Sequence, residues 1–568
     1  MNKIIHIVKS KKSYFLILGL LLLLFFVRLI FLDGDIPPNS LLDYSPVDEG
    51  IYGNLALNTI NFNSINPNSY FGVDFINMSG QVILNFIGNI FIMIGLFVFG
   101  DNYFGFRIPI VITTLITFII IYAIFIEIEK KYNFKNHNLK IIFMFLLVSN
   151  FIIYNASRTV EPTIFRMLFV CLICYLFIKL SDKNKLRSFI IGLLTSISMF
   201  LVYITNSFLC ISFILFIIYL FYMKEFKKAR ECLLFGIIGI GIGCFISQIY
   251  YMYWGTDFLT NTIMIMNDFQ YNTMYAISNN NFLIFFNRVI SFFTSNLFIY
   301  CTPFLIGLFI FLKQILCFFK EKNETIIFST LTIFSLFIQT LVTEDFINRK
   351  IIVLLPVFCM LFYELFIYYR IEGKINTLKS INLLTILVII LCFIKKFFFG
   401  NIGYTQYNST DILISFLFFL LPSIIIIIIL IYPKIYNINN AVIIYFLLIC
   451  FGNSLFIYRY NFKHINFGEK EAMISLREFD DEIILGEYEN GFTLYNNFIP
   501  LLESREKTYE LMKSGKYKFY FDYANVDGYL NTTFPNIKFE KYKIIKRQFP
   551  NQYGNNDMCV YKIKYEED

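Results

Sequence analysis

Long apolar runs separated by short charged segments make up most of the first 460 residues of the chain. Many of these runs approach the 20 or so apolar residues that an α-helix needs to cross a bilayer. Composition agrees, since 57% of the residues are hydrophobic and only 15% are charged. We expect an α-helical polytopic membrane protein. The predicted spans lie at about 13–32, 107–127, 140–156, 163–180, 187–204, 207–223, 232–252, 288–312, 325–342, 350–369, 380–395, 411–432 and 440–458.

Lysine and arginine are distributed unevenly between the two sets of loops that these thirteen spans define. With the N-terminus in the cytoplasm, the segments on that side hold 23 Lys and Arg, and the opposite segments before the C-terminal tail hold eight. Basic residues favour cytoplasmic loops. We therefore predict a multi-pass protein of the cell membrane with a cytoplasmic N-terminus and an extracytoplasmic tail. The net charge of +8 follows from this topology and does not indicate a nucleic-acid partner.

One apolar stretch, residues 81–100, is not among the predicted spans. If it crossed the membrane, every later loop would change sides, leaving 12 Lys and Arg inside and 19 outside. Gln81, Asn85 and Asn89 recur every four residues and give an otherwise apolar helix one polar stripe. We expect a helix that lies flat on the outer surface of the bilayer. The alternative is a spanning helix whose polar stripe packs on its neighbours.

Composition becomes polar and charged near residue 462. We therefore divide the chain into a transmembrane region at 1–462, with a first outer loop at 33–106, and an extracytoplasmic domain at 463–568. About 100 residues can bury a small core of their own, so we expect a compact α/β domain. Its predicted elements are strands at 482–489, 516–523 and 559–565 and a helix at 504–514.

The outer loop at 33–106 contains no Lys or Arg and carries an acidic pair, Asp48 and Glu49, soon after the first span. Such a pair at a membrane surface can take a proton from an acceptor hydroxyl while a membrane-bound substrate lies beside it. The alternative is a solvated loop that happens to carry two carboxylates.

Two further charged motifs fall on the predicted outer side. Arg158 and Glu161 stand in the turn between the third and fourth spans, and Arg349 and Lys350 stand at the start of a later span. Ionisable groups at membrane depth are costly, which makes those kept at span ends candidates for function. Alternatively, Arg349 and Lys350 reach the interface as snorkelling side chains, and Glu161 simply pairs with Arg158. Three such motifs on one side indicate a shared site.

These motifs resemble those of the GT-C superfamily of membrane glycosyltransferases. The branch that they resemble most contains protein O-mannosyltransferases and the aminoarabinose transferases that modify lipid A. The matching segments are Asp48-Glu49 followed by Tyr52 and Ala56, Phe104-Gly105 followed by Arg107-Ile-Pro109, Ser157-Arg158 followed by Glu161, and Arg349-Lys350 followed by Leu355-Pro356. Two features of the sequence depart from the motifs that are usual in this branch. Glu161 stands where Asp is more usual, and residues 74–81 lack the lysine of its Lys-Pro pair.

The resemblance implies an inverting transfer of a sugar from a polyprenyl-phosphate donor to an acceptor at the outer face of the membrane. It suggests Asp48 as the base, and cations, arginine above all, would stabilise the departing phosphate. The expected site residues are Asp48, Glu49 and Glu161 for catalysis, Arg349, Lys350, Arg158 and Arg288 for the donor phosphate, and Tyr52 and Gln81 for substrate contact. A protein, a glycolipid or a glycan would fit as the acceptor.

No cofactor is expected to be required. Asp48, Glu49 and Glu161 could bind a divalent metal, although no ligand spacing in the sequence requires one. The alternative functions are a lipid-linked glycan transporter and a polymerase or ligase of surface polysaccharide. Transporters tend to place ionisable groups near the bilayer midplane and are often built from repeated halves. This chain keeps its charges at span ends and shows no internal repeat.

Overall fold

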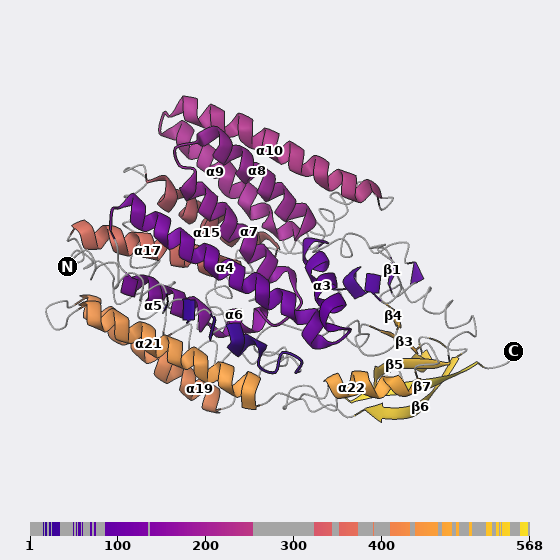
Figure 1. Cartoon of the computed structure of the whole chain (residues 1–568). Coiled ribbons are helices and arrows are strands. Elements are labelled where there is room, and N and C mark those ends of the chain that lie inside the picture. The colour runs from indigo at the N-terminus through magenta and orange to yellow at the C-terminus, as the bar shows by residue number, and fades with distance from the viewer. Residues whose placement is uncertain are drawn as a thin grey trace, which may run out of the picture.

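The computed structural model of the chain is mostly helical in the part that it describes (Figure 1). Its longer described ranges are 86–134, 137–253, 323–343, 352–372, 409–431, 438–463 and 469–479, together with parts of 15–34, 49–74 and 484–565 and the single residue 390.

The described helices follow the apolar runs of the sequence and pack side by side as a bundle (Figure 1). The helices of the bundle are α3 (Phe86–Phe99), α4 (Tyr103–Lys131), α5 (His137–Val148), α6 (Phe151–Ala156), α7 (Pro162–Lys179), α8 (Asn184–Leu201), α9 (Phe208–Tyr222), α10 (Phe226–Tyr253), α15 (Glu324–Thr343), α17 (Leu355–Glu372), α19 (Ser409–Ser415), α20 (Leu421–Ile431) and α21 (Ile438–Ile457). Short 3₁₀ turns precede α9 and α17, at η1 (Ile204–Ser207) and η2 (Ile352–Leu354), and π turns follow α19 and α21, at η5 (Phe416–Leu420) and η6 (Tyr458–Lys463).

Five segments among the described residues are long and apolar enough to cross a membrane: Tyr103–Lys131, Pro162–Lys179, Thr205–Tyr222, Phe226–Met252 and Ile412–Ile429. The predicted polytopic membrane fold is thereby confirmed. The predicted span at 288–312 lies outside the described residues, as do seven residues of the span at 13–32 and every residue of the span at 380–395 except residue 390. The number of thirteen spans therefore stays a prediction.

The predicted span at 140–156 is interrupted and forms two helices, α5 and α6. Asn150 stands between them, and its Oδ1 accepts hydrogen bonds from the backbone N–H groups of Ile152 (3.1 Å) and Ile153 (3.2 Å). This capping starts a new helix, because an N-cap side chain satisfies N–H groups that have no partner within the helix. Asn453 of α21 accepts from the N–H of Phe151 at 2.9 Å. The break is thus held by an amide side chain from a neighbouring helix.

Helix α3 occupies part of the stretch that we expected to lie flat. Its 14 residues extend about 21 Å, less than the ~30 Å of a hydrocarbon core. Asn89 is buried and its Oδ1 accepts from the N–H of Ala56 at 3.0 Å, whereas Phe97 on the other face is 84% exposed. The described part of the polar stripe therefore faces the interior of the protein, and the apolar face of the helix points away from the bundle. Gln81 and Asn85 lie outside the described residues.

A tight turn joins α3 to α4. Gly100 has φ +87°, a value that glycine adopts without steric cost. Asn102 caps α4 by accepting from the N–H of Gly105 at 2.9 Å. The two helices then run back along each other with glycines at their contact, since a Cβ on Gly95 would lie 2.3 Å from the carbonyl oxygen of Gly105.

We expect Gly95→Ala to destabilise the protein by about 1–3 kcal/mol, because the added methyl group would press on backbone that has to shift. Gly241→Ala in α10 is the matched control, since a Cβ there would meet nothing within 4 Å. Thermal unfolding in detergent, followed by circular dichroism, should show a lower melting temperature for the Gly95 variant only. Equal melting temperatures for the two variants would contradict the packing described for α3 and α4.

A mixed five-stranded sheet follows the bundle, in the order β4-β3-β5-β7-β6. Its strands are β3 (Ile484–Glu487), β4 (Ile499–Leu501), β5 (Phe519–Tyr523), β6 (Ile537–Ile545) and β7 (Met558–Tyr565). The strand predictions at 482–489, 516–523 and 559–565 are confirmed as β3, β5 and β7. The predicted helix at 504–514 lies outside the described residues, and β4, β6 and helix α22 (Glu469–Ser475) were not predicted.

The C-terminal sheet lies at the same end of the bundle as α3 and the short strand β1 (Ser69–Tyr70), which pairs with β2 (Val73–Asp74) (Figure 1). Lys470 of α22 forms an ion pair with Asp33, at the start of the 33–106 segment, with 2.7 Å between Nζ and Oδ2. The hydrogen bond from Lys470 lowers the pKa of Asp33. The C-terminal region therefore contacts the loop that carries the acidic motif.

Candidate active site at one end of the helix bundle

Glu49, the second residue of the acidic pair, is fully buried in an ion pair with Arg107. Its carboxylate accepts from Arg107 Nε at 3.0 Å and from Nη2 at 2.7 Å. It also accepts from the backbone N–H of Val160 at 2.7 Å. A two-point contact of this kind is among the stronger hydrogen-bonded ion pairs in proteins. It joins the acidic loop, α4 and the turn before α7 at one point.

Arg107 stands in the second turn of α4 and holds the end of the first predicted span. Its Nη1 donates to the carbonyl oxygens of Leu32 (3.0 Å) and Gly34 (2.5 Å). The guanidinium lies 3.8 Å from the centre of the Tyr103 ring. A positive charge near a helix N-terminus is unfavourable by itself, so the Glu49 carboxylate stabilises both the charge and the helix end.

Gly53 lies one helical turn after Glu49 and lets the acidic segment approach α4 closely. A Cβ at this glycine would lie 2.3 Å from the Phe106 ring and 3.4 Å from a methyl group of Val160. The same two elements that bind the Glu49 carboxylate therefore pack against this glycine. The close fit fixes where Glu49 stands on the bundle.

The turn at residues 157–161 is tied to the first span by two buried arginines. Arg158 donates to the Tyr154 hydroxyl at 3.1 Å and to the carbonyl oxygen of Phe31. Arg28 donates to Ser157 Oγ at 2.9 Å. Burial lowers the pKa of Arg158, and the nearby Arg107 charge lowers it further, although an arginine in a protein keeps its charge.

Glu161 is buried at the N-terminus of α7, where its backbone is extended and Pro162 occupies the first helical position. Proline is favoured at that position because it has no N–H to leave without a partner. The Thr163 hydroxyl lies 3.4 Å from Glu161 Oε2. The positive end of the helix dipole favours a carboxylate here. Because Glu161 follows Val160 directly, it stands next to the contact with Glu49.

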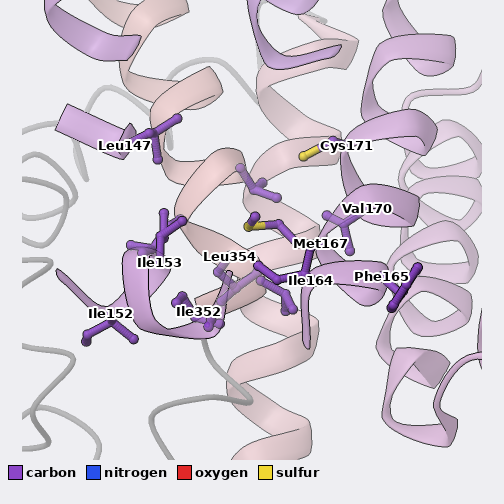
Figure 2. Close-up of a cluster of buried hydrophobic side chains, with 14 of the residues drawn as sticks. Leu147, Ile152, Ile153, Ile164, Phe165, Met167, Val170, Cys171, Ile352 and Leu354 are labelled. Carbon is purple, nitrogen blue, oxygen red and sulfur yellow. The ribbon is translucent and has the colours of Figure 1, made fainter. Parts of the chain in front are cut away.

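The segment that carries Arg349 and Lys350 leads into η2, which packs on α7. Figure 2 shows Ile352 and Leu354 of η2 among the side chains of Ile164 and Met167 of α7. All four are buried. The turn that follows Arg349 and Lys350 is therefore packed against α7, the helix that begins just after Glu161.

Three of the predicted site residues are described and lie close together in this part of the bundle: Glu49, Arg158 and Glu161. The others, Asp48, Tyr52, Gln81, Arg288, Arg349 and Lys350, lie outside the described residues. Arg107 was seen in the sequence only as part of a motif, and its role as the partner of Glu49 was not predicted. A buried carboxylate needs a partner of opposite charge. Arg107 is the first basic residue after the acidic loop, and this position in the sequence is the signal that could have identified it as the partner of Glu49.

The described part of the chain contains no group of three His, Cys, Asp or Glu residues placed to hold a metal ion. Glu49 uses both carboxylate oxygens on Arg107 and Val160. Asp48 is not among the described residues. The absence of a required cofactor therefore stays a prediction.

Residues 86–254 match the sequence profile of the dolichyl-phosphate-mannose-protein mannosyltransferase family. None of the curated protein sequences matches the chain. Among solved structures, ArnT from Cupriavidus metallidurans bound to undecaprenyl phosphate matches with a TM-score of 0.60 and 8% identity, over 97% of each chain. The apo state of the same protein matches with a TM-score of 0.57 and 10% identity, over 98% of each chain. These matches confirm the predicted resemblance: the chain is a membrane protein with the GT-C glycosyltransferase fold, and its similarities lie in the branch of protein O-mannosyltransferases and aminoarabinose transferases.

Proposed function

We propose that the chain is an inverting glycosyltransferase that moves a sugar from a polyprenyl-phosphate donor to an acceptor hydroxyl at the outer face of the membrane. The contact of Glu49 with Val160, 2.7 Å from Oε1 to the backbone N, carries the proposal. It supports one site built from the acidic pair and the 157–161 turn, as the sequence predicts. The similarity of fold to a protein bound to undecaprenyl phosphate supports the lipid carrier.

In the proposed reaction the acceptor oxygen attacks the anomeric carbon of the sugar while Asp48 takes the proton of the hydroxyl. The bond between that carbon and the carrier phosphate oxygen breaks, and its electron pair leaves with the phosphate. Arg349 is the leading candidate to stabilise this charge, because a guanidinium fork fits phosphate geometry. Lys350, Arg158 and Arg288 are the other expected cations.

Glu49 is best assigned as a positioning residue. Its carboxylate is engaged by Arg107 and Val160 and is fully buried, so it would act on the reaction through the placement of Asp48, its neighbour in sequence. Glu161 would bind the acceptor or stabilise Arg158 at the rim of the site. We expect Tyr52 and Gln81 to contact the substrates.

The test is a transfer assay with purified protein and undecaprenyl phosphate loaded with one of several isotope-labelled sugars. Membrane extract supplies protein, glycolipid and glycan acceptors. We expect free undecaprenyl phosphate to accumulate with at least one sugar, in proportion to added protein, as followed by mass spectrometry. The same lipids placed in one leaflet of proteoliposomes test the rival function. Intact lipid-linked sugar appearing in the other leaflet, with no release of the carrier, would indicate a transporter and overturn the proposal.

A further inference from the structure

A second group of buried polar side chains lies beside the candidate site and has no role in the proposed reaction so far. Arg166 of α7 donates from Nε to Asn206 Oδ1 at 3.0 Å, and its guanidinium lies 5.2 Å from the centre of the Tyr203 ring. Asn206 and its neighbour Thr205 belong to η1, the turn between α8 and α9. Arg166, Asn206 and Thr205 are 1%, 0% and 5% exposed. We call these three residues the Arg166 cluster.

Two neutral hydrogen-bonding groups of the Arg166 cluster are buried without a partner. These are the amide nitrogen of Asn206 and the hydroxyl of Thr205. The orientation of the Asn206 amide is fixed, because arginine has only donors and the amide oxygen must face it. The amide nitrogen therefore points away from Arg166. Burying such groups without partners costs free energy, so a ligand that offers oxygen acceptors would be stabilised there.

Helix α15 adds polar groups from a third side. Gln339 donates from Nε2 to the hydroxyl of Ser207, the last residue of η1, at 3.0 Å. Ser335 stands one turn earlier on the same face of α15, is 0% exposed, and its hydroxyl has no partner. Neutral amides and hydroxyls thus gather at η1, from the turn itself and from α15.

The Arg166 cluster is close to the expected point of reaction. Arg166 follows Glu161 by five residues, which is about 7–8 Å along a helix axis. Helix α7 also packs on η2, the turn that follows Arg349 and Lys350 in the sequence. A headgroup held at the candidate site would therefore lie within reach of the Arg166 cluster.

We propose that the Arg166 cluster recognises the sugar of the lipid-linked donor through its hydroxyl oxygens. The proposal rests on the proposed function, since it assigns the part of the donor that this site would read. The groups named here without partners, the Asn206 amide nitrogen and the hydroxyls of Thr205 and Ser335, are neutral. Neutral donors suit sugar hydroxyls, and the Arg166 guanidinium already donates to the Asn206 amide oxygen, whereas phosphate is expected to meet Arg349 and Lys350. Sites that hydrogen-bond a substrate hydroxyl discriminate strongly against substrates that lack it.

The test uses two conservative variants. Thr205→Val removes the hydroxyl at nearly constant volume, and Asn206→Asp keeps the acceptor for Arg166 while replacing the amide donor. Ser188→Ala is the matched control, because Ser188 is another buried hydroxyl without a partner, near the opposite end of α8. Melting temperatures close to that of the unmodified protein establish that each variant is folded.

Binding is measured for bare undecaprenyl phosphate and for the same lipid carrying sugars that differ at one hydroxyl. We expect both variants to bind bare carrier within about twofold of the unmodified protein and to lose about tenfold in preference among the sugars, the effect of one hydrogen bond. The control should change neither. If the variants lost affinity for the bare carrier to the same extent, the cluster would bind the phosphate. If their preference among the sugars did not change, the cluster would have only a structural role. Either result overturns the proposal. Sugar-dependent binding without transfer would instead count against the proposed function.

Discussion

Replacing Arg107 with methionine should cost most of the stability of the protein and all of its transfer activity. The substitution leaves the Glu49 carboxylate fully buried without its charge partner, and breaking a buried ion pair in this way costs about 3–5 kcal/mol. It also removes the two donors that hold the carbonyl oxygens of Leu32 and Gly34. We expect a sharply lower melting temperature in detergent.

The double variant Glu49→Gln/Arg107→Met tests the physical cause. Without the buried charge, the double variant should recover part of the stability that Arg107→Met alone has lost, and the coupling between the two substitutions should be large. Lys179→Met is the control, because its ion pair with Glu127 is at the surface and should leave the melting temperature nearly unchanged. If the stability losses of the two single substitutions simply added in the double variant, Glu49 and Arg107 would not be coupled as described here.

Replacing Asp48 with asparagine should lower the rate of sugar transfer by about 10²–10⁴, the usual contribution of a positioned general base. Asparagine keeps the size of the side chain and cannot accept the proton. The melting temperature and the affinity for bare undecaprenyl phosphate should stay close to those of the unmodified protein. Turnover at the original rate would show that Asp48 is not the base.

The Glu49→Gln variant distinguishes the roles of the two residues of the acidic pair. Because Glu49 is bound to Arg107 and Val160, its change to glutamine should affect stability first and turnover through the position of Asp48. We expect a smaller loss of rate than for Asp48→Asn and a larger loss of stability. The reverse order would assign the chemistry to Glu49.

Hydropathy alone predicted the helical fold well, because each span has to hide its backbone from lipid and therefore appears as one apolar run. The break at Asn150 was missed, since the amide of Asn453, which holds it by accepting from the N–H of Phe151, lies 302 residues further along the chain. Strand β6 was missed for a local reason. A register shift between Lys541 and Lys543 interrupts the alternation of apolar and polar residues that marks a strand.

The site was predicted in part. The acidic pair and the 157–161 turn stand out in sequence because charges near a membrane are costly, and the structure joins them through Glu49 and Val160. The role of Arg107 depends on its contact with Glu49, which lies 58 residues away in the sequence. The Arg166 cluster gave no sequence signal, because one arginine and two small polar residues become notable only when burial leaves their groups without partners.

The central claim is that the acidic pair, the 157–161 turn and the Arg349 segment form one site on the outer face of the membrane. Single cysteines at Asn77, Asp101, Asn136 and Asn437, in a cysteine-free background, test it with an impermeant thiol reagent applied to intact cells. Asp101 is the exposed residue beside the α4 cap. The account predicts labelling at Asn77 and Asp101 and protection at Asn136 and Asn437. Labelling at Asn77 with protection at Asp101, or labelling at Asn136 and Asn437 alone, would contradict it.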